Sequence, residues 1–198
     1  MTETKSNRRG SRKIAAVLAG GLVLGVGTMA TLASWNDSEF AAATFTAGKF
    51  IFEGAADQTT FTDHASTGAA AALTFTAPFN NLTPNDVVYA GYAVRLGTGT
   101  TNNATVTVTN TATGSATDYQ YTLFTTASAG CSAAAASTGT IIATNDLGAG
   151  TGTFTLNKAA VITNPGTATF LCFKVTADST VAQASTSTIT WKLQAVSN

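Results

Sequence analysis

The sequence predicts an all-β protein, a jelly-roll-like antiparallel β-sandwich of about 8–10 strands that follows a cleavable N-terminal signal helix. Three observations support this fold class. Short runs alternate apolar residues with threonine, turn residues separate the runs, and no long amphipathic helical pattern follows the N-terminal region. A period of two places one set of side chains in a core and the other in solvent. An immunoglobulin-like topology is the alternative arrangement of such strands.

The first 33 residues have the parts of a secretory signal peptide. Basic residues come first, and an apolar run from Ile14 to Met29 follows. This run is shorter than the roughly 20 apolar residues of a membrane span, so a retained anchor is the alternative. Small residues predict cleavage between Ala33 and Ser34, and Ala30 offers a second position.

The charge balance differs between the leader and the remainder of the chain. The whole sequence has no net charge, but the residues from Ser34 onward include five basic and nine acidic side chains, a net charge near −4. Binding to phosphates depends on clustered basic residues, so we expect no nucleic acid among the partners. Charged residues make up only 10% of the sequence, and small and hydroxylated residues take their place, as in extracellular β proteins.

Nine runs are candidate strands, separated by turn sequences such as LTPND and TNPGT. In the final run, apolar Ile189, Trp191 and Leu193 alternate with polar residues, which predicts a strand with one core face. The run TATFLCFKVTA is apolar on both faces in its middle, which predicts a central strand. The stretch ASAGCSAAAAS is compatible with either a turn of helix or a loop. The nine runs are Thr44–Glu53, Ala72–Thr76, Val87–Leu96, Ala104–Thr109, Tyr119–Thr125, Thr140–Thr144, Thr153–Leu156, Thr167–Ala177 and Ser187–Val196.

Cys131 and Cys172 are the two cysteines of the sequence. In an oxidising compartment two cysteines most often pair, so we expect a disulfide, with buried free thiols as the alternative. In the chain-entropy model a loop of this length stabilises the fold by roughly 4 kcal/mol. A redox pair is not expected because no C-x-x-C motif occurs.

The sequence carries no recognisable catalytic motif, so we expect neither enzyme activity nor a cofactor. His64 is the single histidine, which excludes a two-histidine zinc motif, and a Ser/His/Asp triad would have to use it. Asp63 and His64 are expected in a solvated loop. The other aspartates are scattered without a calcium-binding ladder, although a single calcium site stays open. A hydrolase is therefore only a third alternative.

Tyr119 and Tyr121 suggest a different alternative function. They share one face of a predicted strand, where they either pack across strands or stack on a sugar. The second arrangement would belong to a monomeric secreted adhesin or a ligand-binding sandwich.

Both ends of the chain resemble the TasA/camelysin family of proteins secreted from Gram-positive bacteria. The segment TLASWNDSEFAAATFTAGKFIF is similar to that family's processing region, which a SipW-type signal peptidase cleaves. LTPND is similar to an L-x-P-G-D turn, with Asn85 in place of glycine, and STITWKLQA is similar to a closing T-W-x-F-x-A strand, with Leu193 in place of phenylalanine. The middle of the chain matches by strand pattern alone. The matching residues of the processing region are Thr31, Ala33, Trp35, Asn36, Asp37, Ala43, Thr44, Phe45 and Gly48.

The resemblance implies a jelly-roll sandwich that serves as a secreted structural protein of biofilm matrix or surface fibres. In the family, the N-terminal segment of one subunit is thought to insert into the sheet of the next. The implied partners are a second copy of the chain in a head-to-tail homopolymer, a SipW-type signal peptidase during export, and an accessory protein that anchors the fibre. The processed protein is expected outside the cell, in the extracellular matrix or at the cell surface, and not in a membrane. The cysteine pair and the low charge depart from the best-known members.

The aromatic-rich segment after the cleavage position is suited to inserting into a neighbouring sheet on physical grounds as well. An edge strand leaves backbone donors and acceptors unpaired, and an extended segment of another chain can pair with them. Head-to-tail insertion does not close, so it produces a filament. The alternative is that the segment folds back onto its own sandwich. The predicted organisation is a signal peptide at residues 1–33, a donor segment at residues 34–44 and a sandwich domain at residues 45–198. The donor residues singled out are Trp35, Asn36, Asp37, Phe40, Thr44 and Phe45.

Overall fold

The computed structural model of the chain describes residues 13–18 and 37–198. The chain divides into two units, Met1–Phe45 and Thr46–Asn198. In the first unit, residues 13–18 are helical and residues 37–45 have no regular secondary structure. No helix within the described ranges has the length and apolar character of a membrane span. The predicted cleavage position, Ala33 and Ser34, lies outside the described residues.

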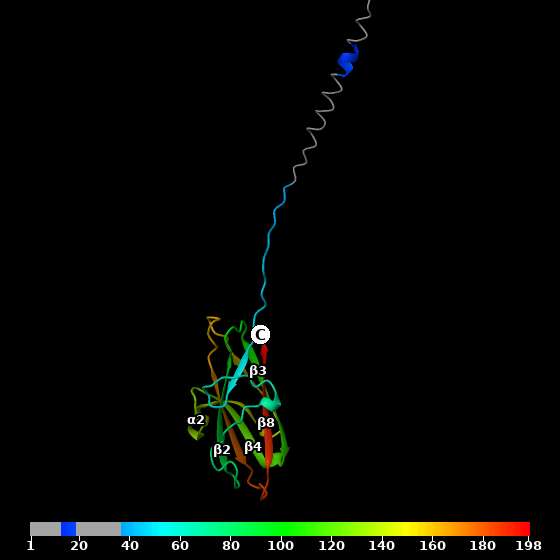
Figure 1. Ribbon diagram of the computed structural model, residues 1–198. Coiled ribbons are helices and arrows are strands. Elements are labelled where there is room, and N and C mark those ends of the chain that lie inside the picture. Colours follow the sequence, from blue (N-terminus) through cyan, green and yellow to red (C-terminus); the bar gives the residue numbers. More distant parts are fainter. Residues whose placement is uncertain (1–12, 19–36) are drawn as a thin grey trace, which may run out of the picture. The chain divides into compact units, whose positions relative to one another are not determined.

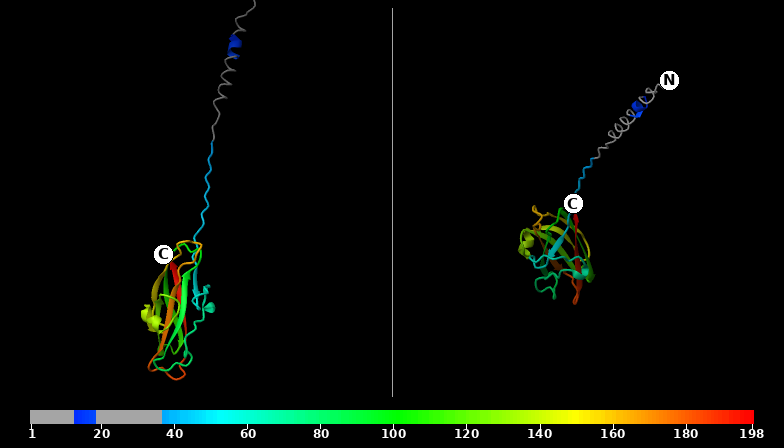
Figure 2. Two further views of the ribbon diagram at one scale, coloured as in Figure 1. Left: turned by 90° about the vertical axis from the view of Figure 1, so that its left-hand side faces the viewer. Right: turned by 45° about the horizontal axis from the view of Figure 1, so that its top comes forward.

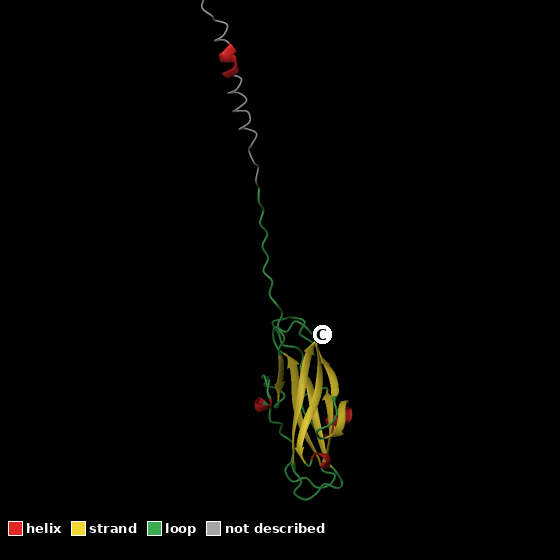
Figure 3. Ribbon diagram, turned by 90° about the vertical axis from the view of Figure 1, so that its right-hand side faces the viewer, coloured by secondary structure: helices red, strands yellow, loops and turns green. Residues whose placement is uncertain are grey.

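The second unit holds all the strands of the described residues (Figure 1). The strands run roughly along one direction, and loops join them at the two ends of the unit (Figures 2 and 3). A short helix, α2, follows the fourth strand, and two 3-10 turns, η1 at Thr67–Ala69 and η2 at Ala116–Asp118, lie in loops. The strands are β1 (Phe52–Ala55), β2 (Val87–Leu96), β3 (Ala104–Gly114), β4 (Tyr119–Thr126), β5 (Thr140–Asp146), β6 (Gly152–Leu156), β7 (Thr169–Ala177) and β8 (Ser187–Ser197), and α2 is Ala133–Thr138.

These strands form two antiparallel sheets. The larger sheet has the order β1-β2-β7-β4-β5 and the smaller one the order β6-β3-β8. Every pair of neighbouring strands is antiparallel. Inward side chains of the two sheets meet in one apolar core. The protein is therefore a β-sandwich, as the alternation of its sequence predicts.

The central strand of the larger sheet is β7, which contains the doubly apolar run of the sequence. Leu171, Phe173 and Val175 point into the core between the sheets. Cys172, on the other face of the strand, is also fully buried. The prediction of a central strand that is covered on both sides is confirmed.

Two predicted strands differ most from the observed ones, and β3 also runs five residues past the predicted end at Thr109. The run Thr44–Glu53 becomes regular only at Phe52, because β1 pairs with the last four residues of β2 and the residues before it extend past the end of β2. The run Ala72–Thr76 is extended but is not a strand, since its backbone bond to β2 is a single one, from the Thr76 N–H to the Tyr89 carbonyl. The ambiguous alanine stretch forms the helix α2, and the Ser132 side chain accepts a bond from the Ala135 N–H at its start.

Candidate functional site

The last strand, β8, is a long sheet edge. It pairs with β3 over its whole length, and no other strand of the described residues pairs with it. Backbone bonds just beyond each end, from the Asn198 N–H to Asn103 and from the Ser115 N–H to Thr186, show that the even-numbered residues bond to β3. In an antiparallel ladder the alternate residues point their backbone groups the other way. The N–H and C=O groups of the odd-numbered residues therefore face the open edge.

The other margins of the sandwich are partly covered. The outer side of β1 is bridged by Thr62, which exchanges two backbone bonds of 2.9 Å with Gly54. On the opposite side the two sheets approach closely at β5 and β6, where a Cβ atom on Gly152 would lie 2.5 Å from the Ile142 carbonyl oxygen. Among the edge strands of the described residues, β8 is therefore the longest with an open side.

A groove follows this edge. Its larger part, about 1120 Å³, lies between the inward side chains of β8, the residues of β1 and the loop after β1. Its smaller part, about 670 Å³, continues toward the loops that precede β2 and β8. Phe75, Ile189 and Trp191 line both parts, so the two parts adjoin. The groove thus extends along most of β8.

The burial pattern shows that the core is incomplete beside β8. On β3 the inward residues Val106 and Val108 are fully buried. On β8 the inward residues Ile189, Trp191 and Leu193 are only half-buried, although they pack against the same core. A further strand beside β8 would cover these side chains.

Trp191 lies at the centre of the groove. Its ring centroid is 4.7 Å from that of Phe173, and it meets Tyr121 edge-on at 5.9 Å and Phe75 at 6.4 Å. The indole Nε1 is buried and has no hydrogen-bond partner among the described residues. A buried donor without an acceptor is costly. An acceptor on an inserted segment would remove that cost.

The walls of the groove mix apolar and polar side chains, and the larger part also holds the ionisable side chains Glu53, Asp63, His64 and Lys192. Burial raises the pKa of the Tyr92 phenol, and burial also outweighs the hydrogen bonds of Asn145 and Asn110 in raising the pKa of Tyr121. Both phenols are therefore neutral at physiological pH. The groove can accept an extended segment that brings apolar side chains to Ile189, Trp191 and Leu193.

The predicted donor residues that the structure describes are accessible. Phe40 and Phe45 are 96% and 92% exposed, and Asp37 and Thr44 are exposed as well. Trp35 and Asn36, like Ala33 and Ser34, lie outside the described residues. A large aromatic side chain in water loses the stabilisation that burial would give it.

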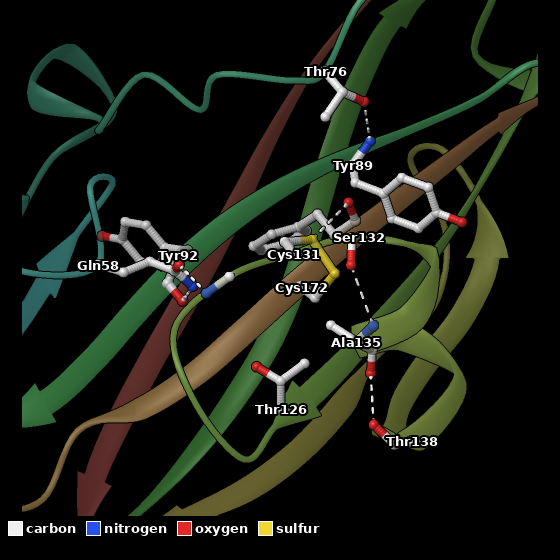
Figure 4. The surroundings of a disulfide bond; sticks show 12 residues. Gln58, Thr76, Tyr89, Tyr92, Thr126, Cys131, Ser132, Ala135, Thr138 and Cys172 are labelled. Atoms are coloured by element: carbon white, nitrogen blue, oxygen red, sulfur yellow. Dashed lines mark hydrogen bonds between the residues drawn. A yellow bond between two sulfur atoms is a disulfide. The ribbon is translucent and has the colours of Figure 1, made fainter.

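The two cysteines form a disulfide, as expected from the sequence. Cys131 in the connection after β4 is joined to Cys172 of β7, with a Cα–Cα distance of 5.1 Å (Figure 4). The neighbouring Gly130 N–H donates to the Gln58 side chain at 2.7 Å, and the Gln58 amide donates to the Tyr92 carbonyl at 3.3 Å. The disulfide and Gln58 thus fasten the loop to the outer face of the larger sheet.

The other residues considered in the sequence are two tyrosines of β4 and the loop residues Asp63 and His64, which line the larger part of the groove. Tyr119 and Tyr121 are buried in the core, so the idea that they stack on a sugar is wrong. His64 lies in an exposed loop, where its ring nitrogens contact the Thr62 hydroxyl and the Ala69 carbonyl. No group of three or more His, Cys, Asp or Glu side chains suited to a metal ion occurs in the part of the chain that the structure describes.

The acceptor residues on β8 were not identified from the sequence. Its alternation shows which side chains face the core, but not which strand lies at an edge. The half-burial of Ile189, Trp191 and Leu193 depends on the strand order of both sheets. No family model matches the chain, and neither a curated protein nor a solved structure shows detectable similarity to it. The resemblance to the TasA/camelysin family rests on the quoted motifs alone.

Proposed function

We propose that this protein is a secreted structural subunit that polymerises into extracellular fibres of a biofilm matrix or cell surface. Each subunit donates residues 34–44, with the adjoining Phe45, to the groove beside β8 of the next subunit. The open edge of β8 is the single observation that carries the proposal. An SipW-type signal peptidase would free the donor segment, and an accessory protein would anchor the fibre.

The edge and the segment complement each other in length. Residues 34–44 equal in number the 11 residues of β8. The odd-numbered residues of β8 offer backbone donors and acceptors, and a strand that pairs with them gains affinity from main-chain bonds and specificity from side chains in the groove. Exposed Phe45 and the half-buried core beside β8 both gain from this association.

The strand order also supports the proposal. A jelly roll consists of eight strands in two sheets. Here the smaller sheet has three strands and ends at β8, and no strand of the described residues pairs with the outer side of β8. We interpret the sandwich as a jelly-roll-like fold whose own eight strands divide into five and three, and whose smaller sheet gains a fourth strand from another subunit. A strand supplied in this way would extend the smaller sheet and would pair with the backbone groups of the odd-numbered residues of β8.

Electron microscopy of the processed protein tests the proposal. We expect threads from a chain that begins at Ser34 and no threads from a chain that lacks residues 34–44. The truncated chain retains the groove but has no donor, so adding it to the processed chain should cap growing ends and shorten the threads. Threads from both proteins, or from neither, would contradict strand donation.

The rival functions give different results in the same samples. A monomeric adhesin or ligand-binding sandwich would remain monomeric at high concentration, whether or not residues 34–44 are present. Binding of a small molecule in the groove would then be measurable by calorimetry. Self-insertion of the donor segment would also leave monomers, but removal of the segment would lower their melting temperature.

A further inference from the structure

The sandwich begins and ends at the same pole. Gly48 and Lys49 lie against the loop at residues 97–103, where the Thr101 N–H donates to the Lys49 carbonyl. The same loop holds the C-terminus, because the Asn198 N–H donates to the Asn103 carbonyl. We call this end of the sandwich the first pole. The loops at residues 78–86 and 178–186, where β2 and β8 begin, form the opposite pole (Figure 1).

Because of this placement, the direction of an inserted strand relative to β8 determines whether neighbouring subunits point the same way or face each other. β8 runs from the opposite pole to the first pole, and chain continuity joins Phe45 to the first pole of its own sandwich. In antiparallel insertion Phe45 meets the start of the acceptor's β8, so the first pole of one subunit faces the opposite pole of the next. In parallel insertion Phe45 meets the end of β8, so two first poles face each other. Two subunits in that second arrangement can exchange donor segments reciprocally and close as a dimer.

Exposed apolar residues lie at both poles of the sandwich. Val161 and Ile162 are 57% and 53% exposed, and the Gly99 N–H donates to the Ile162 carbonyl, which places them at the first pole. Phe79 is 55% exposed in the loop before β2, at the opposite pole. A stack of subunits that all point the same way brings these two patches together. In a closed dimer Phe79 stays in water in both subunits.

The donor segment has an alternating pattern that suits one face. Ala41, Ala43 and Phe45 alternate with Ala42 and Thr44. Within residues 41–45 the odd-numbered set is wholly apolar and the even-numbered set ends in a hydroxyl, so in this stretch the odd-numbered residues face the core, whereas Phe40 lies on the outer face with Thr44. Small side chains on that face leave room for the large ring of Trp191. Thr44 then points to the outer face of the sheet, as do the even-numbered residues of β8.

We infer that the donor strand lies antiparallel to β8 and that all subunits of the fibre point the same way. This inference rests on the proposed function. The sandwich favours this direction, since every pair of neighbouring strands in it is antiparallel and antiparallel pairing is the more stable of the two, although one isolated bridge, between Lys49 and Thr100, is parallel. Phe79 of one subunit packs on Val161 and Ile162 of the next, as a second contact beside the inserted strand. Parallel insertion would end growth at two subunits.

Cross-linking of the processed chain tests the direction. One variant combines Thr44→Cys with Thr188→Cys, and its matched control combines Thr44→Cys with Val196→Cys. Positions 188 and 196 lie on the same face of β8, about 27 Å apart. A thiol cross-linker of about 10 Å therefore tolerates a register shift of two residues but discriminates between the ends of the strand. The native disulfide leaves no other thiol to react.

We expect a ladder of covalent dimers, trimers and longer products from the Thr188→Cys variant, and little product from the Val196→Cys variant. Covalent dimers alone from the Val196→Cys variant would overturn the inferred direction and leave strand donation intact. A protein that gives no cross-link and no threads would overturn the proposed function together with the inference.

The second contact has its own test. Phe79→Ser should raise the protein concentration needed for thread formation by about tenfold, because an apolar side chain no longer leaves water at each joint. Ile141→Ser is the control, since Ile141 is 62% exposed on β5 and lies away from both poles. Equal threshold concentrations for the two variants would show that Phe79 makes no contact in the fibre.

Discussion

Proline substitutions in β8 can test separately the backbone groups that bond to β3 and those that face the open edge. The Ala195 N–H faces the open edge, whereas the neighbouring Gln194 pairs with Thr107 of β3. Proline has no N–H and is tolerated in an edge strand where that group faces solvent. Ala195→Pro should therefore leave the single sandwich close to its normal stability. It should weaken the insertion of another strand, because a carbonyl of that strand would face the proline ring and would have no N–H at position 195 to bond with.

Ala195→Pro should weaken the joint between subunits, whereas Gln194→Pro should lower the stability of the single sandwich. Ala195→Pro removes one hydrogen bond per joint, about 1–1.5 kcal/mol, which is roughly a tenfold weaker joint before any steric effect. Gln194→Pro leaves the Thr107 carbonyl without its donor, which costs about 1–3 kcal/mol and lowers the melting temperature by roughly 3–10 °C. Melting should be measured on chains that lack residues 34–44, and thread formation on processed chains. Normal threads from Ala195→Pro, or a large loss of its melting temperature, would refute the assigned edge.

Three further predictions concern the stability of the sandwich. Reduction of the disulfide should lower the melting temperature by about 8–16 °C without loss of the β circular dichroism, since its loop spans 41 positions and contributes roughly 4 kcal/mol; unchanged melting would contradict this. Bonds from the Thr83 N–H and hydroxyl lower the pKa of the Asp86 carboxyl, so its contribution is present at neutral pH and is lost as the pH falls below about 4. The melting temperature should exceed that of Asp86→Asn at pH 7, and a difference that persists undiminished at pH 2 would count against this linkage. Gly54→Ala should destabilise by about 1–3 kcal/mol in chemical denaturation, because the new Cβ would lie 1.9 Å from the Tyr92 hydroxyl oxygen, whereas Gly68→Ala, with nothing within 4 Å, should be neutral.

The sequence predicted the parts of the fold that depend on local pattern. The doubly apolar run around Cys172 became the central strand β7, and the alternation around Trp191 became β8. The disulfide followed from the presence of two cysteines in a chain that the sequence predicts to be exported. In each case the signal lies within a few residues, because the period of the side chains determines which faces are buried.

The features that the sequence did not predict depend on long-range arrangement. The length of β1 is set by where β2 ends, so the run Thr44–Glu53 could not reveal that its regular part begins at Phe52. The buried position of Tyr121 depends on Trp191, which is 70 residues away along the chain. The open edge of β8 exists because β3 and β6 complete the smaller sheet on one side only.

The alternation of backbone direction along β8 has a consequence for amide hydrogen exchange. In a single sandwich the amide protons of Gln194 and Lys192 are held in the ladder with β3, while those of Leu193 and Ala195 face water. Adjacent amides of one strand should therefore exchange with deuterium at alternately slow and fast rates. Once a foreign strand occupies the edge, the fast amides become slow and the alternation disappears. Residue-resolved exchange rates would thus count the occupied joints in a sample without any added label.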